Sequence, residues 1–240
     1  MSNAVALVKL GFARAGVSLT RISNTLPYRR QQFLRELGVT AVLDIGANSG
    51  QYASELRKHG YKGRLVSFEP LAKPFKILVE CAAKHQNHRC LQIALGSVDG
   101  NAEINVSENI VSSSLLAVRD ESVTACHASR RVGTETIEVR RLDTVRADVL
   151  RPADRVHLKI DTQGTEREVL LGGAETLQQV VSIELELSFA PLYDNQPLFT
   201  EMCQFLEERA FRCVWLERGF TNERTGHTLQ VDGFFLRPGS

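Results

Sequence analysis

Apolar and amphipathic stretches alternate along the chain from residue 40 onward. Short apolar runs of strand length are followed by stretches whose apolar residues recur at helical spacing. This order is typical of a parallel sheet with helices on both faces. The expected strands are 40–45, 64–68, 89–95, 156–160, 181–187, 211–216 and 233–236, and the expected helices are 51–59, 73–85, 166–171 and 198–209. The last two strands are predicted to form a hairpin.

The alternation is interrupted in the middle of the chain. Residues 102–106 and 136–141 alternate between polar and apolar side chains, which predicts an inserted pair of strands. Residues 107–133 follow no steady period. Such a long irregular stretch inside a compact domain is more often a functional loop than an idle connection. We therefore expect this stretch to lie beside the bound substrate.

Residues 1–35 precede the alternation, and we expect them to form a helical extension to a domain that spans 36–240. Apolar and basic residues mix near the N-terminus, which predicts a short basic amphipathic helix. Such a helix packs on its own domain, packs on a second subunit in a homodimer, or makes a peripheral contact with a membrane that carries a lipid-linked substrate. No apolar run approaches the roughly 20 residues that a transmembrane helix needs.

The composition excludes several classes of protein. A hydrophobic content of 43%, a charged content of 24% and a net charge of +1 are typical of one soluble domain with no nucleic-acid partner. The five cysteines include no C-x-x-C pair, which favours a reducing compartment. We therefore expect a cytoplasmic protein, either free or at the inner membrane surface.

The most informative motif follows the first expected strand. Asp44 ends the strand, a turn carries Gly46, Asn48 and Gly50, and a helix is expected to begin at Gln51. Glycines let backbone approach a nucleoside, and a carboxylate at a strand end accepts hydrogen bonds from it. A dinucleotide fingerprint would need glycine at positions 48 and 51, so the motif argues against NAD. It resembles instead motif I of class I methyltransferases, which bind S-adenosylmethionine.

Two further strand ends complete the predicted cofactor site. Glu69 and Pro70 follow the second expected strand, where a carboxylate can accept hydrogen bonds from both ribose hydroxyls. Ala94 and Leu95 end the third expected strand, and this small apolar stretch is suited to line an adenine ring.

The fourth and fifth strands carry charges where a covered parallel sheet is normally apolar. His157, Lys159 and Asp161 share one face, and so do Glu184 and Glu186. Buried charges need partners. We therefore predict that Lys159 pairs with Glu184 or Glu186.

Asp161 and Glu186 lie nearest the carboxyl ends of these strands, beside the expected methyl donor, and are candidate catalytic residues. Asp161 is also a candidate cofactor-binding residue. Asp161 is the first candidate for a general base that takes the proton of an acceptor hydroxyl. A divalent ion such as Mg²⁺, held by Asp161 and Glu186, is the alternative route. His227, before the last strand, is a further candidate base.

Four motifs together resemble the FkbM family of methyltransferases over residues 38–237. They are LDIGANSG at 43–50, FEP at 68–70, ALG at 94–96 and LKIDTQGTE at 158–166. The usual family form of the last motif has glutamate where this chain has Gln163. The resemblance implies a class I, Rossmann-like fold with strand order 3-2-1-4-5-7-6 and an antiparallel seventh strand.

The resemblance also implies O-methylation by S-adenosylmethionine, often of sugar or polyketide hydroxyls in glycolipids, polysaccharides and natural products. Three alternatives stay open at this point. They are a methyltransferase for another small molecule, a nucleic-acid methyltransferase, and a non-catalytic nucleoside-binding module of the same fold.

Overall fold

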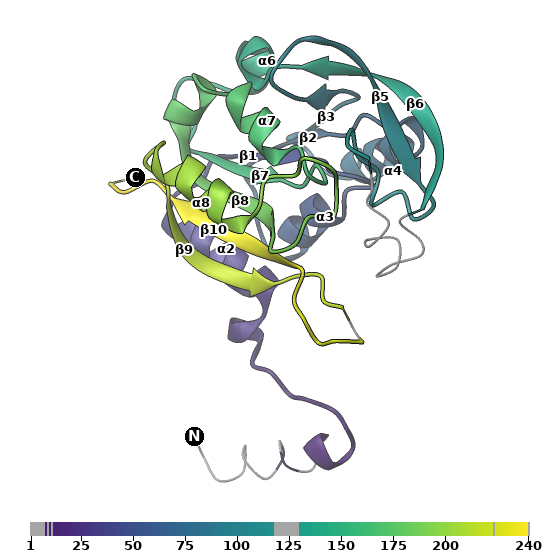
Figure 1. Cartoon of the computed structure of the whole chain (residues 1–240). Coiled ribbons are helices and arrows are strands. Elements are labelled where there is room, and N and C mark those ends of the chain that lie inside the picture. The colour runs from purple at the N-terminus through teal and green to yellow at the C-terminus, as the bar shows by residue number, and fades with distance from the viewer. Residues whose placement is uncertain (1–7, 9, 11, 118–129, 223, 240) are drawn as a thin grey trace.

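A seven-stranded sheet forms the centre of the molecule (Figure 1). The computed structural model describes residues 8, 10, 12–117, 130–222 and 224–239. The strands are β1 (Ala41–Ile45), β2 (Arg64–Phe68), β3 (His88–Leu91), β7 (Val156–Ile160), β8 (Val180–Ser188), β9 (Arg212–Arg218) and β10 (Gln230–Leu236). Their order is β3-β2-β1-β7-β8-β10-β9, and β10 is antiparallel to both neighbours. This is the order and the antiparallel strand of the class I methyltransferase fold, so the predicted fold is confirmed.

Helices cover both faces of this sheet, as predicted for a doubly covered α/β domain. The helices are α2 (Leu26–Glu36), α3 (Gln51–Lys58), α4 (Ala72–Ala82), α6 (Leu142–Val149), α7 (Glu166–Leu171) and α8 (Phe199–Glu207), with short 3-10 turns η1 (Ile22–Asn24) and η3 (Thr176–Gln179). One apolar core joins the sheet to α6, α7 and α8, and a smaller core on the other face joins it to α2 and α3. Because both faces are buried, the central strands are largely apolar.

A second sheet carries the predicted insertion. It consists of β4 (Ala94–Leu95), β5 (Gly100–Ser107) and β6 (Arg131–Arg140) in the order β4-β6-β5. The antiparallel pairing of β5 with β6 confirms the inserted strand pair. The prediction of one strand over 89–95 was wrong, since β3 pairs with β2 whereas β4 pairs with β6 in the second sheet. The chain leaves the main sheet because β6 offers β4 a new backbone partner.

The N-terminal part of the chain divides into two regions. Helix α2 packs on the domain, where Leu34 joins the smaller core. The described residues before α2 reach away from the domain (Figure 1), and Val8, Leu10 and Phe12 among them are exposed. The predicted amphipathic helix falls partly on residues 1–7, 9 and 11, which lie outside the described residues. Within the described part of the chain, no helix has the length and apolar character of a membrane span.

Candidate active site

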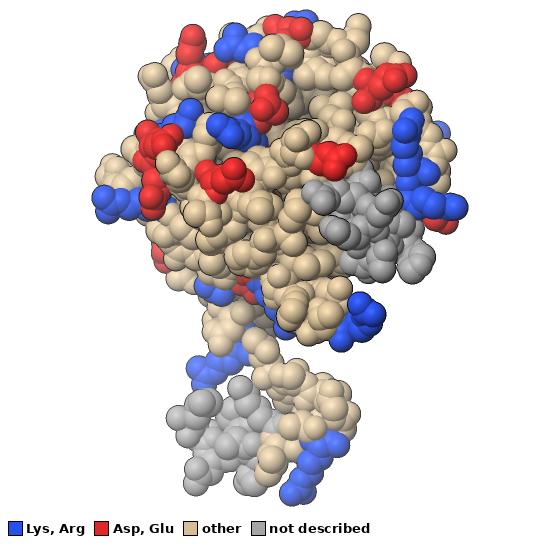
Figure 2. Space-filling model, viewed as in Figure 1, with Lys and Arg blue, Asp and Glu red and all other residues tan. Residues whose placement is uncertain are grey.

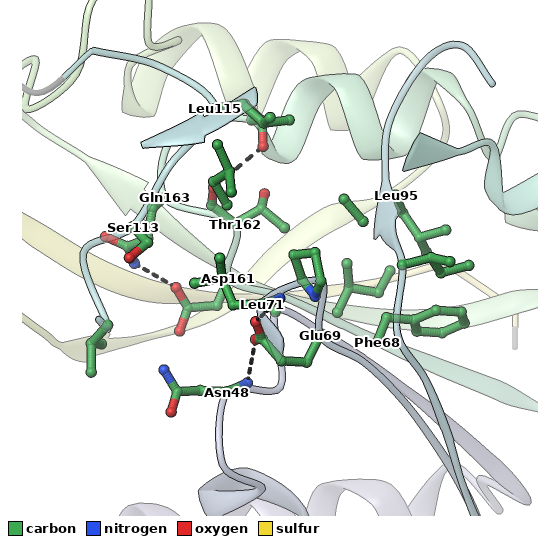
Figure 3. Close-up of a pocket in the computed structure, with 18 of the residues that line it drawn as sticks. Asn48, Phe68, Glu69, Leu71, Leu95, Ser113, Leu115, Asp161, Thr162 and Gln163 are labelled. Carbon is green, nitrogen blue, oxygen red and sulfur yellow. Dashed lines mark hydrogen bonds between the residues drawn. The ribbon is translucent and has the colours of Figure 1, made fainter. Parts of the chain in front are cut away.

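A pocket opens at the carboxyl ends of β1, β2 and β7 (Figure 3). This edge of an open α/β sheet is the usual place for a ligand. The pocket encloses about 690 Å³ of empty space, part of it open to solvent. Its lining includes seven predicted cofactor residues: Gly46, Asn48, Glu69, Pro70, Ala94, Leu95 and Asp161.

Glu69 is held in a fixed orientation at the end of β2. Its carboxylate accepts hydrogen bonds from the backbone N–H groups of Asn48 and Leu71, both at 2.9 Å. Figure 3 shows both bonds on the pocket wall. The residue is 5% exposed, and burial raises its pKa to about 7 although the two N–H donors oppose this shift. The carboxylate of Glu69 is therefore held in place at the pocket wall, and its contact with the ribose hydroxyls stays a prediction.

Apolar side chains line much of the remaining pocket, beside the polar residues Ser113, Thr162, Gln163 and Thr165. Phe68, Leu71, Ile93 and Leu95 supply one part of this surface. The inserted strands supply another part, from Ile104 on β5 and from Ile110, Val111 and Leu115 in the segment after it. From the sequence we expected residues 107–133 beside the acceptor. Ile110, Val111 and Leu115, which belong to the described part of this stretch, line the same pocket as Glu69. Residues 118–129 of that predicted loop lie outside the described residues.

The glycines of the turn after β1 allow close packing of the backbone. Gly46 has φ +76°, and a Cβ there would lie 1.9 Å from the carbonyl oxygen of Asp161. Gly50 has φ +86°, and a Cβ would approach Leu78 of α4 to 3.0 Å. Only glycine adopts such conformations without strain. Gly50 and Gln51 do not line the pocket, so their predicted contact with the cofactor stays a prediction.

Asp44 and Lys159 form a buried ion pair beneath the pocket. The Lys159 amine lies 3.5 Å from Asp44 Oδ1 and 3.5 Å from Asp161 Oδ2. Burial raises the pKa of Asp44 even though Lys159 opposes the shift, and Asp44 is 0% exposed. A direct hydrogen bond from the cofactor to Asp44 therefore stays a prediction, because its carboxylate has no surface in the pocket.

The predicted pairing of Lys159 with Glu184 or Glu186 was wrong. The strand register places Lys159 opposite both Asp44 and Glu184. Glu184 binds Arg30 of α2 instead, which donates to it at 2.6, 2.9 and 3.1 Å. Because the Arg30 guanidinium already binds the Glu184 carboxylate, Lys159 pairs with Asp44 and Asp161 instead.

A buried polar network surrounds the Arg30–Glu184 pair. The Tyr52 hydroxyl donates to Glu184 at 2.8 Å and lies 3.2 Å from His157 Nε2. His157 Nδ1 lies 2.8 Å from the Ser182 hydroxyl. The polar residues of β7 and β8 are therefore satisfied within the fold, as buried charges require.

Asp161 and Glu186 meet through the side chain of Gln163. Gln163 Nε2 donates to Asp161 Oδ1 at 2.6 Å and to Glu186 Oε2 at 3.1 Å. Burial, and next the charge of Asp161, raises the pKa of Glu186 well above its usual range. Asp161 lines the pocket and Glu186 lies behind it. The two predicted catalytic carboxyl groups are thus brought together, with only Asp161 facing the ligand space.

Glu166 is an organising residue for which the sequence motif indicated no role. It is buried, and its Oε1 accepts from the backbone N–H groups of Thr162 and Gly164, both at 3.0 Å. These bonds fix the loop that carries Asp161 and Gln163. The signal was the place of Glu166 as the last residue of the LKIDTQGTE motif at 158–166.

His227 lies on the exposed hairpin between β9 and β10, where its carbonyl accepts from the backbone N–H of Asn222. It does not line the pocket. The hairpin extends past the edge of the sheet, so the structure does not bring His227 together with Asp161, and its position gives no support to a role as base.

Within the described residues, no group of three or more His, Cys, Asp or Glu side chains is arranged to hold a metal ion. Asp161 and Glu186 are only two acidic groups, and an amide N–H donor stands between them. The Mg²⁺ site at these two residues stays a prediction.

Comparison with known proteins decides the family. A family model for the methyltransferase FkbM domain matches residues 44–213. The chain belongs to this family. The FkbM match covers the turn after β1, Glu69 and the loop with Asp161 and Gln163, so the methyltransferase prediction is confirmed at the level of the family.

One curated relative of this FkbM protein is the 2-O-methyltransferase NoeI of Sinorhizobium fredii (strain NBRC 101917 / NGR234). It is 28% identical over 163 residues, which make up 65% of this chain and 66% of NoeI. The match thus spans just under two thirds of the length of the relative.

Solved structures of other methyltransferases are more distant. A putative O-methyltransferase from Klebsiella pneumoniae is 11% identical, with a TM-score of 0.47 and coverage of 99% of this chain and 90% of that one. An rRNA methylase from Streptococcus thermophilus is 10% identical, with a TM-score of 0.48 and coverage of 91% and 99%. Because both TM-scores are below 0.5, the fold assignment rests on the strand order and the family match.

Proposed function

We propose that this FkbM protein uses S-adenosylmethionine to methylate a hydroxyl of a sugar in a glycolipid, polysaccharide or related natural product. The observation that carries the proposal is the convergence of Glu69 and Asp161 on one pocket in a chain of a methyltransferase family. The relative NoeI, named as a 2-O-methyltransferase, supports oxygen as the acceptor atom.

The residues of the pocket fit the proposed methyl donor. Glu69 offers a buried carboxylate for the ribose hydroxyls, and the two N–H donors hold it in place. Ile93, Leu95 and Ile104 offer an apolar surface for the adenine ring. A pocket with few placed polar groups and an otherwise apolar lining is the usual form of a cofactor site.

The protein has two tasks in this reaction. When bound, S-adenosylmethionine supplies a methyl group whose bond to sulfur breaks as its bond to the acceptor oxygen forms, leaving S-adenosylhomocysteine. The first task of the chain is alignment of the acceptor, which accounts for much of the acceleration. The second is removal of the hydroxyl proton, which Asp161 accepts. A well-placed base typically contributes a factor of about 10²–10⁴.

We place the acceptor at a membrane surface because of the N-terminal segment. Val8, Leu10, Phe12 and Ile22 are exposed, and no acidic residue precedes Glu36 in the chain. In Figure 2 the described part of the segment below the domain carries Lys or Arg side chains. Apolar and basic groups together favour anionic lipid. A lipid-linked sugar would be presented at such a surface. Homodimer formation stays a prediction.

Vesicle co-sedimentation tests the membrane contact. The full chain should sediment with vesicles of anionic phosphatidylglycerol and not with neutral phosphatidylcholine. The double variant Arg14→Glu, Arg21→Glu should lose the binding, whereas Lys62→Glu, elsewhere on the domain, should keep it. Equal binding to neutral vesicles, or none to either, would argue against a membrane acceptor.

Two measurements test the proposed activity. Calorimetry should detect binding of S-adenosylhomocysteine and none of NAD. Mass spectrometry of glycolipids and polysaccharides from cells with and without the protein should reveal one methyl group that depends on it. If S-adenosylhomocysteine does not bind, the chain is a degenerate module. If it binds and the cells without the protein lack a methyl group on RNA instead, the acceptor is a nucleic acid.

A further inference from the structure

Gln163 occupies an unusual position between the two candidate catalytic carboxyl groups. It follows β7 in the left-handed backbone conformation, with φ +55°. From there, the single nitrogen Nε2 donates to both Asp161 and Glu186. The two carboxyl groups therefore share the donors of one uncharged amide.

Tyr193 fixes which end of the Gln163 amide faces the carboxyl groups. Its hydroxyl donates to Gln163 Oε1 at 2.7 Å, so the amide oxygen is already engaged on the opposite side. The ring of Tyr193 packs closely on Gly164, where an added Cβ would lie 3.3 Å from the ring. The reversed amide would place an oxygen against two carboxyl groups and is therefore disfavoured.

Glu186 also accepts a hydrogen bond from a second side-chain amide. Gln230 Nε2 donates to the same Oε2 atom at 2.5 Å. Burial and the nearby charge of Asp161 both raise the pKa of Glu186, so its surroundings disfavour a second negative charge beside Asp161. The amide N–H donors of Gln163 and Gln230 compensate the charge that these two carboxyl groups carry.

We propose that Gln163 is a positioning residue whose amide nitrogen takes the place of a bridging cation and holds Asp161 ready to accept the proton of the acceptor. The inference rests on the proposed O-methylation. The transferred proton moves from the acceptor oxygen to an Asp161 oxygen, and Gln163 gives up no proton in the step. The chain thus works without a divalent metal.

The pH profile of kcat/KM tests the positioning role, with Gln163→Met as the main variant. Methionine has a similar shape but donates no hydrogen bond to Asp161. A hydrogen bond to a charged group favours that charged form, so its loss should move the acidic limb of the profile upward by about one pH unit. The KM of the acceptor and the Kd of S-adenosylhomocysteine should change less than about threefold, because the shape of the pocket is retained.

Gln230→Met is the matched control for this variant. It removes an equal amide donor from Glu186 without contacting Asp161. The acidic limb should therefore stay within about 0.3 pH unit of the original chain, whatever happens to the maximal rate. An unshifted limb in Gln163→Met, or equal shifts in both variants, would show that Gln163 is only structural.

Metal binding supplies a readout that is independent of activity. Gln163→Glu places a third carboxylate between Asp161 and Glu186, and three carboxylates form an oxygen site of the kind that holds Mg²⁺. Calorimetry with MgCl₂ should detect binding to Gln163→Glu and none to the original chain. The rate of the original chain should be unaffected by EDTA.

Two results would overturn the inference. One is Mg²⁺ binding by the original chain that Asp161→Asn removes; the other is loss of its rate in EDTA with recovery in Mg²⁺. Either would mean that a cation, and not the amide, bridges the two carboxyl groups. If Mg²⁺ binding follows the expected pattern but no methyl transfer is detected, only the proposed function is contradicted.

Discussion

Replacement of Arg30 by methionine should destabilise the fold by about 3 kcal/mol at pH 7. Arg30 is 5% exposed and Glu184 is 4% exposed. Burial alone would raise the pKa of Glu184, but the charge and hydrogen bonds of Arg30 and His157 together outweigh burial, and the pKa falls from 4.5 to about 2. At about 1.4 kcal/mol for each pKa unit, this shift corresponds to roughly 3 kcal/mol. The loss of one partner from a buried ion pair typically costs a similar amount, about 3–5 kcal/mol.

The pH dependence of this loss has a definite sign. The folded-state pKa of Glu184 lies below its unfolded value, so its contribution is fully present above about pH 4.5 and is lost as the pH falls toward 2. The difference in unfolding free energy between the original chain and Arg30→Met should therefore be largest near pH 7. It should shrink steadily between pH 5 and pH 3.

Urea denaturation followed by far-UV circular dichroism measures both effects. The matched control is Arg29→Met on the same helix. Arg29 is 41% exposed in its side chain and pairs with Glu217 at 3.3 Å, so its loss should cost less than about 1 kcal/mol. Adding Glu184→Gln to Arg30→Met should recover part of the loss. A loss below about 1 kcal/mol in Arg30→Met, or one that does not shrink by pH 3, would refute the reasoning.

Two further predictions concern the turn after β1 and the ribose carboxylate. Gly46→Ala should lower the free energy of unfolding by roughly 3 kcal/mol or more, because strain at φ +76° adds to a clash with Asp161. Gly60→Ala, with φ +94° and open space around it, should lose only about 1–2 kcal/mol in the same urea assay, and equal losses would contradict the clash. Glu69→Gln should weaken S-adenosylhomocysteine binding about tenfold or more. In the original chain, calorimetry should find weaker binding as the pH falls through about 7, since the protonated carboxyl accepts fewer hydrogen bonds; constant affinity from pH 6 to 8 would exclude Glu69 as the acceptor.

The strand pattern was predictable because it depends on local sequence. The strands 64–68 and 156–160 have the bounds that the apolar runs predicted. The 89–95 segment was not predictable in this way. Its residues form one stretch of strand length with mixed polarity, but the choice between β2 and β6 as partner depends on where the inserted strands fold back.

The partners of the buried charges come from parts of the sequence that lie far apart. Alternation along β7 and β8 predicted that Lys159 and Glu184 lie on polar faces that can meet, and the strand register places the two residues opposite each other. It could not reveal that Arg30, 154 residues before Glu184, fills that carboxylate from the other side. The bridging amide of Gln163 was hidden for the same reason, because Tyr193 orients it from a separate loop.

Transfer of a labelled methyl group tests the central claim most directly. Purified protein with S-adenosylmethionine labelled in its methyl group should place label in the glycolipid or polysaccharide fraction of cells that lack the protein. Asp161→Asn should bind S-adenosylhomocysteine within about threefold of the original affinity and transfer at least about 10²-fold less label. Label that appears in RNA, or undiminished transfer by Asp161→Asn, would contradict the account.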